Sequence, residues 1–384
     1  NADITGSEII TTSDYSPTLV AQSIGGGGGF ALVTGSGTGS TQVGSRNLSG
    51  AATAGDVTVT LNSYLLTQGE FSTALTAQSI GGGGGYTGQA LGNARFGALN
   101  VSGDLSSGNV DATLTGNVIT TGNNSSALVV QTIGGGGGFG AEVIGDANLG
   151  MTSSSQGIAN AGSITFVGDG DLVVTAQNDS PALVLQSIGG GGGWIGNVGG
   201  NATLGANQIG VANAGSIDAR VRYPEIQTNG QNSIGVLAQA IAGGGGFTGR
   251  SSGNALTLGG TIASNSTSNA GDVLLKNHAR INTFGINSSA LVVQSIAGGG
   301  GSSATNDGDT VRLGAISTAG SSGSLPTVQS GNVTVTNTQN LRTHAVGSVG
   351  LLAQSIAGGG GYVAQSGNQT QHEVVYGSNG AINA

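Results

Sequence analysis

One pattern of apolar and polar positions occurs seven times along the chain, and Ala127 to Phe139, ALVVQTIGGGGGF, is a typical copy. In every copy an aliphatic residue stands three positions before a glutamine, an isoleucine two positions after it and a serine six positions before it. The glutamines are Gln22, Gln78, Gln131, Gln186, Gln239, Gln294 and Gln354. Successive glutamines lie 53 to 60 residues apart, so a repeat of about 55 residues organises the chain.

The residues around each glutamine have the pattern of a buried strand. Side chains of a strand alternate between its two faces. The positions three and one before the glutamine carry leucine, valine or alanine on one face, and the isoleucine shares the other face with the glutamine. Both faces are largely apolar, which is typical of a parallel sheet covered on both sides.

Each repeat holds further strand-like segments and almost no helix signals. Alternating runs precede the glutamine strand, as in Gly55 to Leu61 (GDVTVTL), Gly162 to Val167 (GSITFV) and Gly331 to Asn337 (GNVTVTN). Short strands between glycine and asparagine turns predict an all-β, elongated β-solenoid that spans residues 1–384 as one repeat domain. A seven-bladed propeller is the alternative, which we disfavour because propeller blades are antiparallel with half-exposed outer strands.

Five small residues, nearly all glycine, follow the isoleucine in every copy. Their number is constant although the repeat length varies, which argues against a flexible linker, and the lysine of a phosphate-binding loop does not follow them. We therefore expect a packed corner in which extended glycine segments stack on their copies. The middle glycines of the seven runs are Gly27, Gly83, Gly136, Gly191, Gly244, Gly299 and Gly359.

Alanine replaces the first glycine of the run at Ala242, Ala297 and Ala357. This predicts an ordinary negative φ at the first position, and a positive φ or steric exclusion of Cβ at the other four positions. We also expect a substitution of Gly191 to cost far more stability than one of Gly199, which lies outside the run.

An aromatic residue follows the glycine run in six of the seven copies. These residues are Phe30, Tyr86, Phe139, Trp194, Phe247 and Tyr362. Aromatic side chains at one repeated position are more often core than binding surface, so we expect them to close one end of the interior. Trp194, Tyr86 and Tyr362 are the candidates for a ligand platform if the rings are open to solvent.

The repeated glutamine needs hydrogen-bond partners, because an unpaired buried amide costs roughly 1–3 kcal/mol. If one repeat makes one turn of the solenoid, each glutamine bonds to its copies above and below in an amide ladder. If one repeat makes two or three smaller turns, each amide bonds to local backbone instead. The sequence leaves both arrangements open.

Composition narrows the function further. Charged residues make up 7% of the chain, against about 25% in an average soluble domain, and the net charge is −9 with no basic cluster. We therefore expect no nucleic-acid partner. The chain has no cysteine, and no apolar run reaches the roughly 18 residues of a membrane span, so we expect no membrane span in these residues.

Residues suited to catalysis or metal binding are few. Close pairs of acids occur in Gly168 to Leu172 (GDGDL) and in Asn306 to Thr310 (NDGDT), where both look like Asp-Gly turns. The three histidines, His278, His344 and His372, share no spacing and occupy no repeated position. We expect no enzyme activity, no metal and no cofactor.

The copies from Ser180 to Trp194 (SPALVLQSIGGGGGW) and from Gly235 to Phe247 (GVLAQAIAGGGGF) resemble the glycine-rich repeats in passenger regions of large autotransporter proteins of Gram-negative bacteria. The resemblance covers nearly the whole chain. It implies secretion to the bacterial cell surface, a cysteine-poor β-solenoid and a role in adhesion or in surface layers.

Our expected function is a noncatalytic extracellular structural protein, a segment of a surface fibre or of an autotransporter-like adhesin. Neither end of the sequence looks like a polar cap, so we expect copies of the chain to associate head to tail or side by side. Surface glycans or other cells are further expected partners. The alternative function is a carbohydrate-binding or polysaccharide-cleaving β-helix protein.

Overall fold

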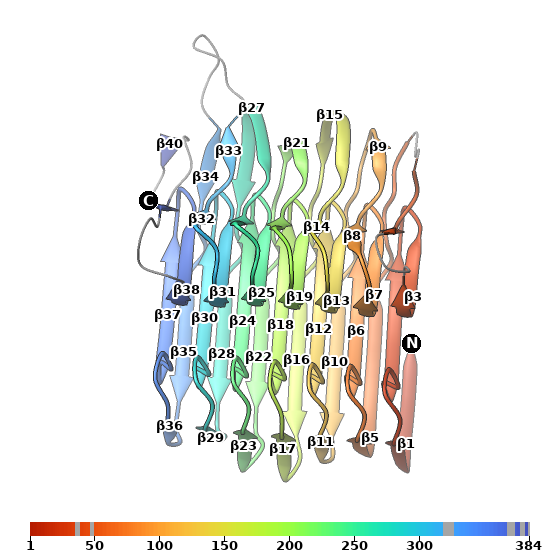
Figure 1. The fold of residues 1–384 in the computed structure, drawn as a ribbon, viewed down its shortest axis with the longest axis vertical. Coiled ribbons are helices and arrows are strands. Elements are labelled where there is room, and N and C mark those ends of the chain that lie inside the picture. The colour runs from red at the N-terminus through yellow and green to blue at the C-terminus, as the bar shows by residue number, and fades with distance from the viewer. Residues whose placement is uncertain (35–38, 47–49, 318–325, 367–372, 377–380, 383–384) are drawn as a thin grey trace.

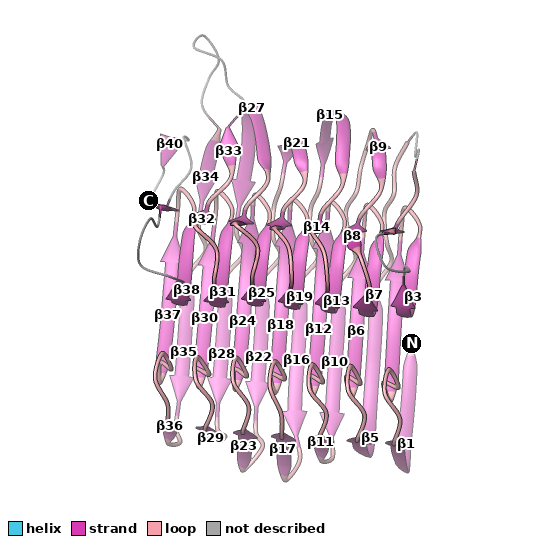
Figure 2. Cartoon of the chain, viewed as in Figure 1, coloured by secondary structure: helices cyan, strands magenta, loops and turns pink. Residues whose placement is uncertain are grey.

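The chain winds through seven stacked turns, and each turn is made by one sequence repeat (Figure 1). The computed structural model describes residues 1–34, 39–46, 50–317, 326–366, 373–376 and 381–382. All named strands pair in parallel, mostly with the equivalent strands of the neighbouring turns, and no helix occurs in this part of the chain (Figure 2). These features confirm the predicted elongated β-solenoid, and the antiparallel blades of a propeller are absent from the described residues.

Equivalent strands form five sheets that run along the solenoid axis. The outer sheet contains β1 (Ala2–Thr11), β5 (Val57–Thr67), β10 (Val110–Thr115), β11 (Val118–Thr120), β16 (Ile164–Asp169), β17 (Leu172–Thr175), β22 (Ile217–Val221), β23 (Glu225–Thr228), β28 (Val273–Asn277), β29 (Arg280–Thr283), β35 (Val333–Asn337) and β36 (Leu341–Thr343). The central sheet contains the glutamine strands β2 (Leu19–Ile24), β6 (Leu75–Ile80), β12 (Leu128–Gly134), β18 (Leu183–Gly189), β24 (Val236–Ala242), β30 (Leu291–Ile296) and β37 (Leu351–Ile356).

The other three sheets lie downstream of the glutamine in each repeat. The glycine sheet contains β3 (Gly28–Thr34), β7 (Gly84–Ala90), β13 (Gly137–Val143), β19 (Gly192–Val198), β25 (Gly245–Ser251), β31 (Gly300–Asn306) and β38 (Gly360–Ser366). The rim sheet contains β4 (Ser40–Val43), β8 (Asn93–Phe96), β14 (Ala147–Leu149), β20 (Ala202–Leu204), β26 (Ala255–Leu258), β32 (Thr310–Leu313) and β39 (Glu373–Tyr376). The apical sheet, at the top of Figure 1, contains β9 (Leu99–Val101), β15 (Thr152–Ile158), β21 (Asn207–Val211), β27 (Thr261–Asn269), β33 (Ile316–Ser317), β34 (Thr327–Gln329) and β40 (Ala381–Ile382).

The central sheet is buried on both faces, as its sequence pattern predicts. In β12, Leu128 and Val130 pack into one core cluster with Val110 of the outer sheet. Val129, between them, packs into a second cluster with Phe139 of the glycine sheet. All seven residues of β12 are buried. The outer, central and glycine sheets are therefore three successive layers, and the other two layers cover the two faces of the central sheet.

The glycine run turns the chain from the central sheet into the glycine sheet. The second to fifth residues of each run have positive φ, for example 92° at Gly190 and 139° at Gly193, whereas the first residue does not. This confirms the φ values expected from the alanines at the first position. The expectation that the whole run is extended is wrong, because its second and third residues form a turn between the central strand, which ends at or just before the first residue, and the glycine-sheet strand, which begins at the fourth residue.

Glycines of neighbouring turns approach too closely for a side chain. A Cβ on Gly192 would lie 1.8 Å from the carbonyl oxygen of Gly245, and one on Gly191 would lie 2.7 Å from that of Gly135. The packed corner is thus correct. Gly199, the comparison position outside the run, is also crowded, because a Cβ there would lie 2.2 Å from the carbonyl oxygen of Ile144. Stacked turns crowd glycines outside the run as well.

We predict that Gly192→Ala lowers the free energy of unfolding by about 2–6 kcal/mol, since it combines a positive φ with a backbone clash. Thermal denaturation followed by circular dichroism measures the loss. Gly55→Ala is the matched control, because the nearest heavy atom to a Cβ at Gly55 is Ser23 Oγ at 3.6 Å. If Gly192→Ala does not fold, the less crowded Gly191→Ala replaces it. Equal melting temperatures for the glycine-run variant and the control would contradict the packed corner.

Candidate functional site

The seven repeated glutamines form one continuous ladder. The Nε2 of each glutamine donates to the Oε1 of the glutamine in the next turn, with six N···O distances between 2.6 and 2.8 Å. Gln78, Gln131, Gln186, Gln239 and Gln294 are fully buried. The open question of the sequence is therefore answered, since one repeat makes one turn and the amides satisfy each other.

A second ladder fixes the turn that precedes the central sheet. The backbone N–H of each repeated serine donates to the Oγ of the serine in the next turn, at 2.9 to 3.0 Å. The residue before each serine has a left-handed backbone, with φ between 53° and 56° in six turns and 73° at Gly347. The serines are thus structural residues that hold this strained turn in register.

The aromatic residues after the glycine runs stack on each other along the axis. The ring centroids of Phe30, Tyr86, Phe139, Trp194 and Phe247 are separated by 4.1 to 6.3 Å from turn to turn. Tyr86 and Trp194 are buried, so neighbouring rings rather than solvent cover their faces. Burial also raises the pKa of the Tyr86 hydroxyl to about 12. These two candidates for a ligand platform therefore lie in the core.

The remaining candidate of the platform, Tyr362, is partly buried in the last turn and donates to the carbonyl oxygen of Gly347. In the sixth turn Ser302 takes the aromatic position and donates to Oε1 of Gln294 at 2.7 Å. A polar residue is thus accepted at this position because the glutamine ladder lies beside it.

The described acids and histidines noted in the sequence each contact a different partner and do not form a common site. Asp169 faces Arg222 at 3.9 Å, and Asp307 pairs with Arg250 at 2.8 Å. His278 contacts Thr338, and His344 stacks on Phe284. His372 lies outside the described residues. Among the residues that the structure describes, no three potential metal ligands form a group.

A different set of polar side chains comes together along the molecule, and we call it the polar seam. It combines the residue before the repeated serine with the sixth residue of the glycine-sheet strand. The first position contributes Asn124, Asp179, Asn232 and Asn287, and the second contributes Gln89, Glu142, Asn197, Arg250 and Thr305. The seam follows the solenoid axis because both positions recur in successive turns.

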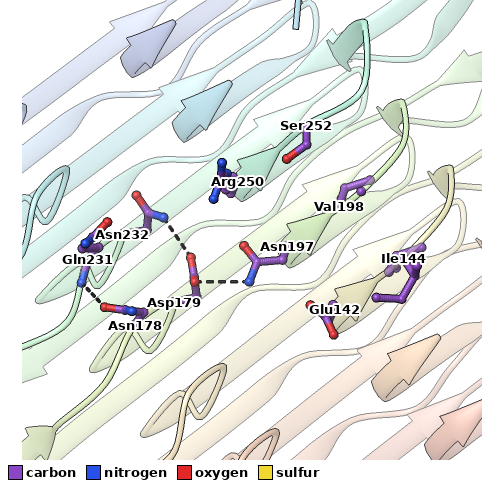
Figure 3. A pocket seen from close by; sticks show the side chains of 12 residues that line it. Glu142, Ile144, Asn178, Asp179, Asn197, Val198, Gln231, Asn232, Arg250 and Ser252 are labelled. Atoms are coloured by element: carbon purple, nitrogen blue, oxygen red, sulfur yellow. Dashed lines mark hydrogen bonds between the residues drawn. The ribbon is translucent and has the colours of Figure 1, made fainter. Parts of the chain in front are cut away.

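Hydrogen bonds join the two sides of the seam. Asn197 Nδ2 donates to Asn124 Oδ1 at 3.0 Å and to Asp179 Oδ2 at 3.2 Å. Asn232 Nδ2 donates to the other carboxylate oxygen of Asp179 at 2.9 Å and its Oδ1 accepts from Thr305 at 3.1 Å. Each oxygen of the Asp179 carboxylate therefore accepts an amide N–H (Figure 3).

A cavity of about 320 Å³ opens in the middle of the polar seam. Glu142, Asp179, Asn197 and Arg250 contribute polar or charged side chains to its wall, and Ile144 contributes an apolar one (Figure 3). The cavity has the size of a small-ligand site. Its wall offers both hydrogen-bond donors and hydrogen-bond acceptors.

Asp179 is the electrostatically unusual group of the cavity. Loss of water around its carboxyl group raises the pKa to about 6, and Glu142 adds to the increase. The amides of Asn232 and Asn197 and the charge of Arg250 oppose the increase. A share of the Asp179 side chains is consequently protonated in mildly acidic solution.

Sequence reasoning missed the polar seam. The one signal is the position before the repeated serine, which is aromatic at Tyr15 and Phe71 and becomes Asn or Asp in the next four repeats. The two aromatic rings stack on each other, with their ring centroids 5.0 Å apart. The change from an aromatic ring at Phe71 to Asn or Asp from Asn124 onward is the start of the first side of the seam.

Comparison with protein-family models, with curated proteins and with solved structures finds no match for this chain. Within the described part of the chain, no helix is long and apolar enough to cross a membrane.

We predict that Gln186→Leu costs at least about 2 kcal/mol of unfolding free energy, because it leaves a donor of Gln131 and an acceptor of Gln239 unpaired in the core. Chemical denaturation of both proteins measures the difference. Gln227→Leu, in the partly exposed outer sheet, is the control for the same change outside a ladder. A Gln186→Leu protein as stable as the parent would show that the ladder contributes nothing.

A further prediction concerns pH. The folded pKa of Asp179, about 6, exceeds the ordinary value, so the folded state binds the proton more tightly than the unfolded state does. Its contribution to stability therefore falls as pH rises from about 4 to 6 and is constant above that window. Asp179→Asn should remove this pH dependence, although the Nδ2 of the new amide cannot accept a hydrogen bond and leaves either Asn197 or Asn232 without its acceptor.

Melting temperatures of the parent and of Asp179→Asn at about pH 4.5 and pH 7.5 check this prediction. The stability of the variant relative to the parent should be lower at the lower pH than at the higher pH. Asp111→Asn, which removes an exposed charge of the outer sheet, is the matched control. A difference between parent and Asp179→Asn that is the same at both pH values would refute the assignment.

Proposed function

We propose that the chain is a noncatalytic structural segment of a bacterial surface fibre or of an autotransporter-like adhesin, located outside the cell. The observation that carries the proposal is the glutamine ladder, which runs through all seven turns. Each turn contacts chiefly its neighbours, so such a solenoid gains length by adding turns without a new core. The resemblance of the glycine-rich repeats to autotransporter passengers supports the location.

We propose further turns of the same kind, from the same protein or from a second copy, as partners. The Oε1 of Gln22 and the Nε2 of Gln354 lie at opposite ends of the ladder. The Nε2 at one end of a chain can therefore donate to the Oε1 at the other end of a second copy. Leu351 lies in the edge strand β37 and is 44% exposed. Sedimentation velocity at micromolar concentration tests the pairing, and a monodisperse monomer would count against it.

Immunogold labelling of intact source cells with an antibody against residues 1–384 tests the proposed location. Gold should lie on the cell exterior or on projecting fibres, and mild protease treatment of intact cells should remove the label. A cytoplasmic enzyme labelled in parallel is the control for leaky cells. Label that appears only after the cells are permeabilised would overturn the proposal.

A further inference from the structure

We propose that the cavity in the polar seam binds a neutral oligosaccharide that lies along the solenoid axis. The proposal assigns a ligand class to the surface of the solenoid. It rests on the side chains of the cavity and not on the proposed location or fibre role.

The amides of the cavity are held in place before a ligand arrives. Asn197 and Asn232 each donate to Asp179, and Gln231 donates its backbone N–H to Asn178 Oδ1 at 2.8 Å. Oδ1 of Asn197 is buried and has no hydrogen-bond partner. Such an orphaned acceptor in a preorganised wall is satisfied by the hydroxyl group of a ligand.

The charges of the cavity favour a neutral ligand. Glu142 and Asp179 place two carboxylates in the wall, which repel an anion. Arg250 is the cation of the wall, and Asp307 already pairs with it at 2.8 Å. A divalent cation is also disfavoured, because amide N–H groups of Asn197 and Asn232 point at the Asp179 oxygens that would bind it.

The shape and the apolar part of the wall match a sugar. Sugar rings carry hydroxyl groups around an edge and C–H groups on a face. Ile144 is 49% exposed beside the cavity and offers an aliphatic contact for such a face. Glu142, Asn197 and Arg250 lie at the same position of three consecutive turns, which follow each other at about 4.8 Å. This regular spacing along the axis suits a linear chain of sugar units.

Binding of the purified 384-residue chain to an array of neutral and acidic glycans, followed by calorimetric titration with the best neutral glycan, tests the proposal. We expect selective binding of neutral oligosaccharides. Ser252→Trp fills the exposed rim of the cavity without changing the hydrogen bonds of Asp179, and Asn197→Ala removes the orphaned acceptor. Each variant should weaken binding at least tenfold, whereas Gln227→Ala in the outer sheet should leave binding unchanged.

Circular dichroism melts of each variant establish that the solenoid is folded before affinities are compared. The absence of binding to any neutral glycan at millimolar concentration would overturn the proposal. Binding that persists in Ser252→Trp, or selective binding of acidic glycans, would overturn it as well. So would a rise in melting temperature with calcium chloride that Asp179→Asn abolishes, because the cavity would then be a cation site.

Discussion

Parallel pairing of each repeat with its own copy is the constraint on which the rest of the structure depends. Because strands pair in register, Gln131 meets Gln78 and Gln186, and Gly192 meets Gly137 and Gly245. A residue at a buried position must therefore be compatible with itself at the spacing of two strands. Glutamine satisfies this by amide bonding, an aromatic ring by stacking, and glycine by having no side chain. The rarity of charged residues follows from the same rule, since like charges at that spacing repel.

Much of the fold could be predicted from the sequence because the residue types at fixed positions of each repeat determine the local backbone conformation and burial. The two apolar faces of the central strand, the positive φ of the last four residues of each glycine run and the buried aromatic column all follow from the residue types within one short motif and their comparison between its seven copies. The choice between one turn and several turns per repeat could not be predicted, because local backbone satisfies a glutamine as well as another glutamine does. The crowding at Gly199 was missed because its obstacle, the carbonyl of Ile144, belongs to the previous turn.

The polar seam was beyond sequence reasoning for a related reason. It joins Asn197 to Asp179, 18 residues before it, and to Asn124, 73 residues before it. These residues occupy two repeated positions at which the residue type changes from turn to turn, so a search for constant positions passes over them. In a molecule whose buried columns are nearly uniform, a specific surface can arise only where the repeat varies. The cavity lies at such a place.

The glutamine ladder also gives the solenoid a net dipole along its axis. Neighbouring backbone hydrogen bonds of a parallel sheet alternate between N–H and C=O, and their dipoles along the ladder largely cancel. The six side-chain bonds all run from Nε2 to Oε1 in the same sense, so their dipoles add, as peptide dipoles do in a helix. Each bond in such a row polarises the next. The core thus contains a row of aligned amide dipoles, with partial positive charge toward Gln354 and partial negative charge toward Gln22.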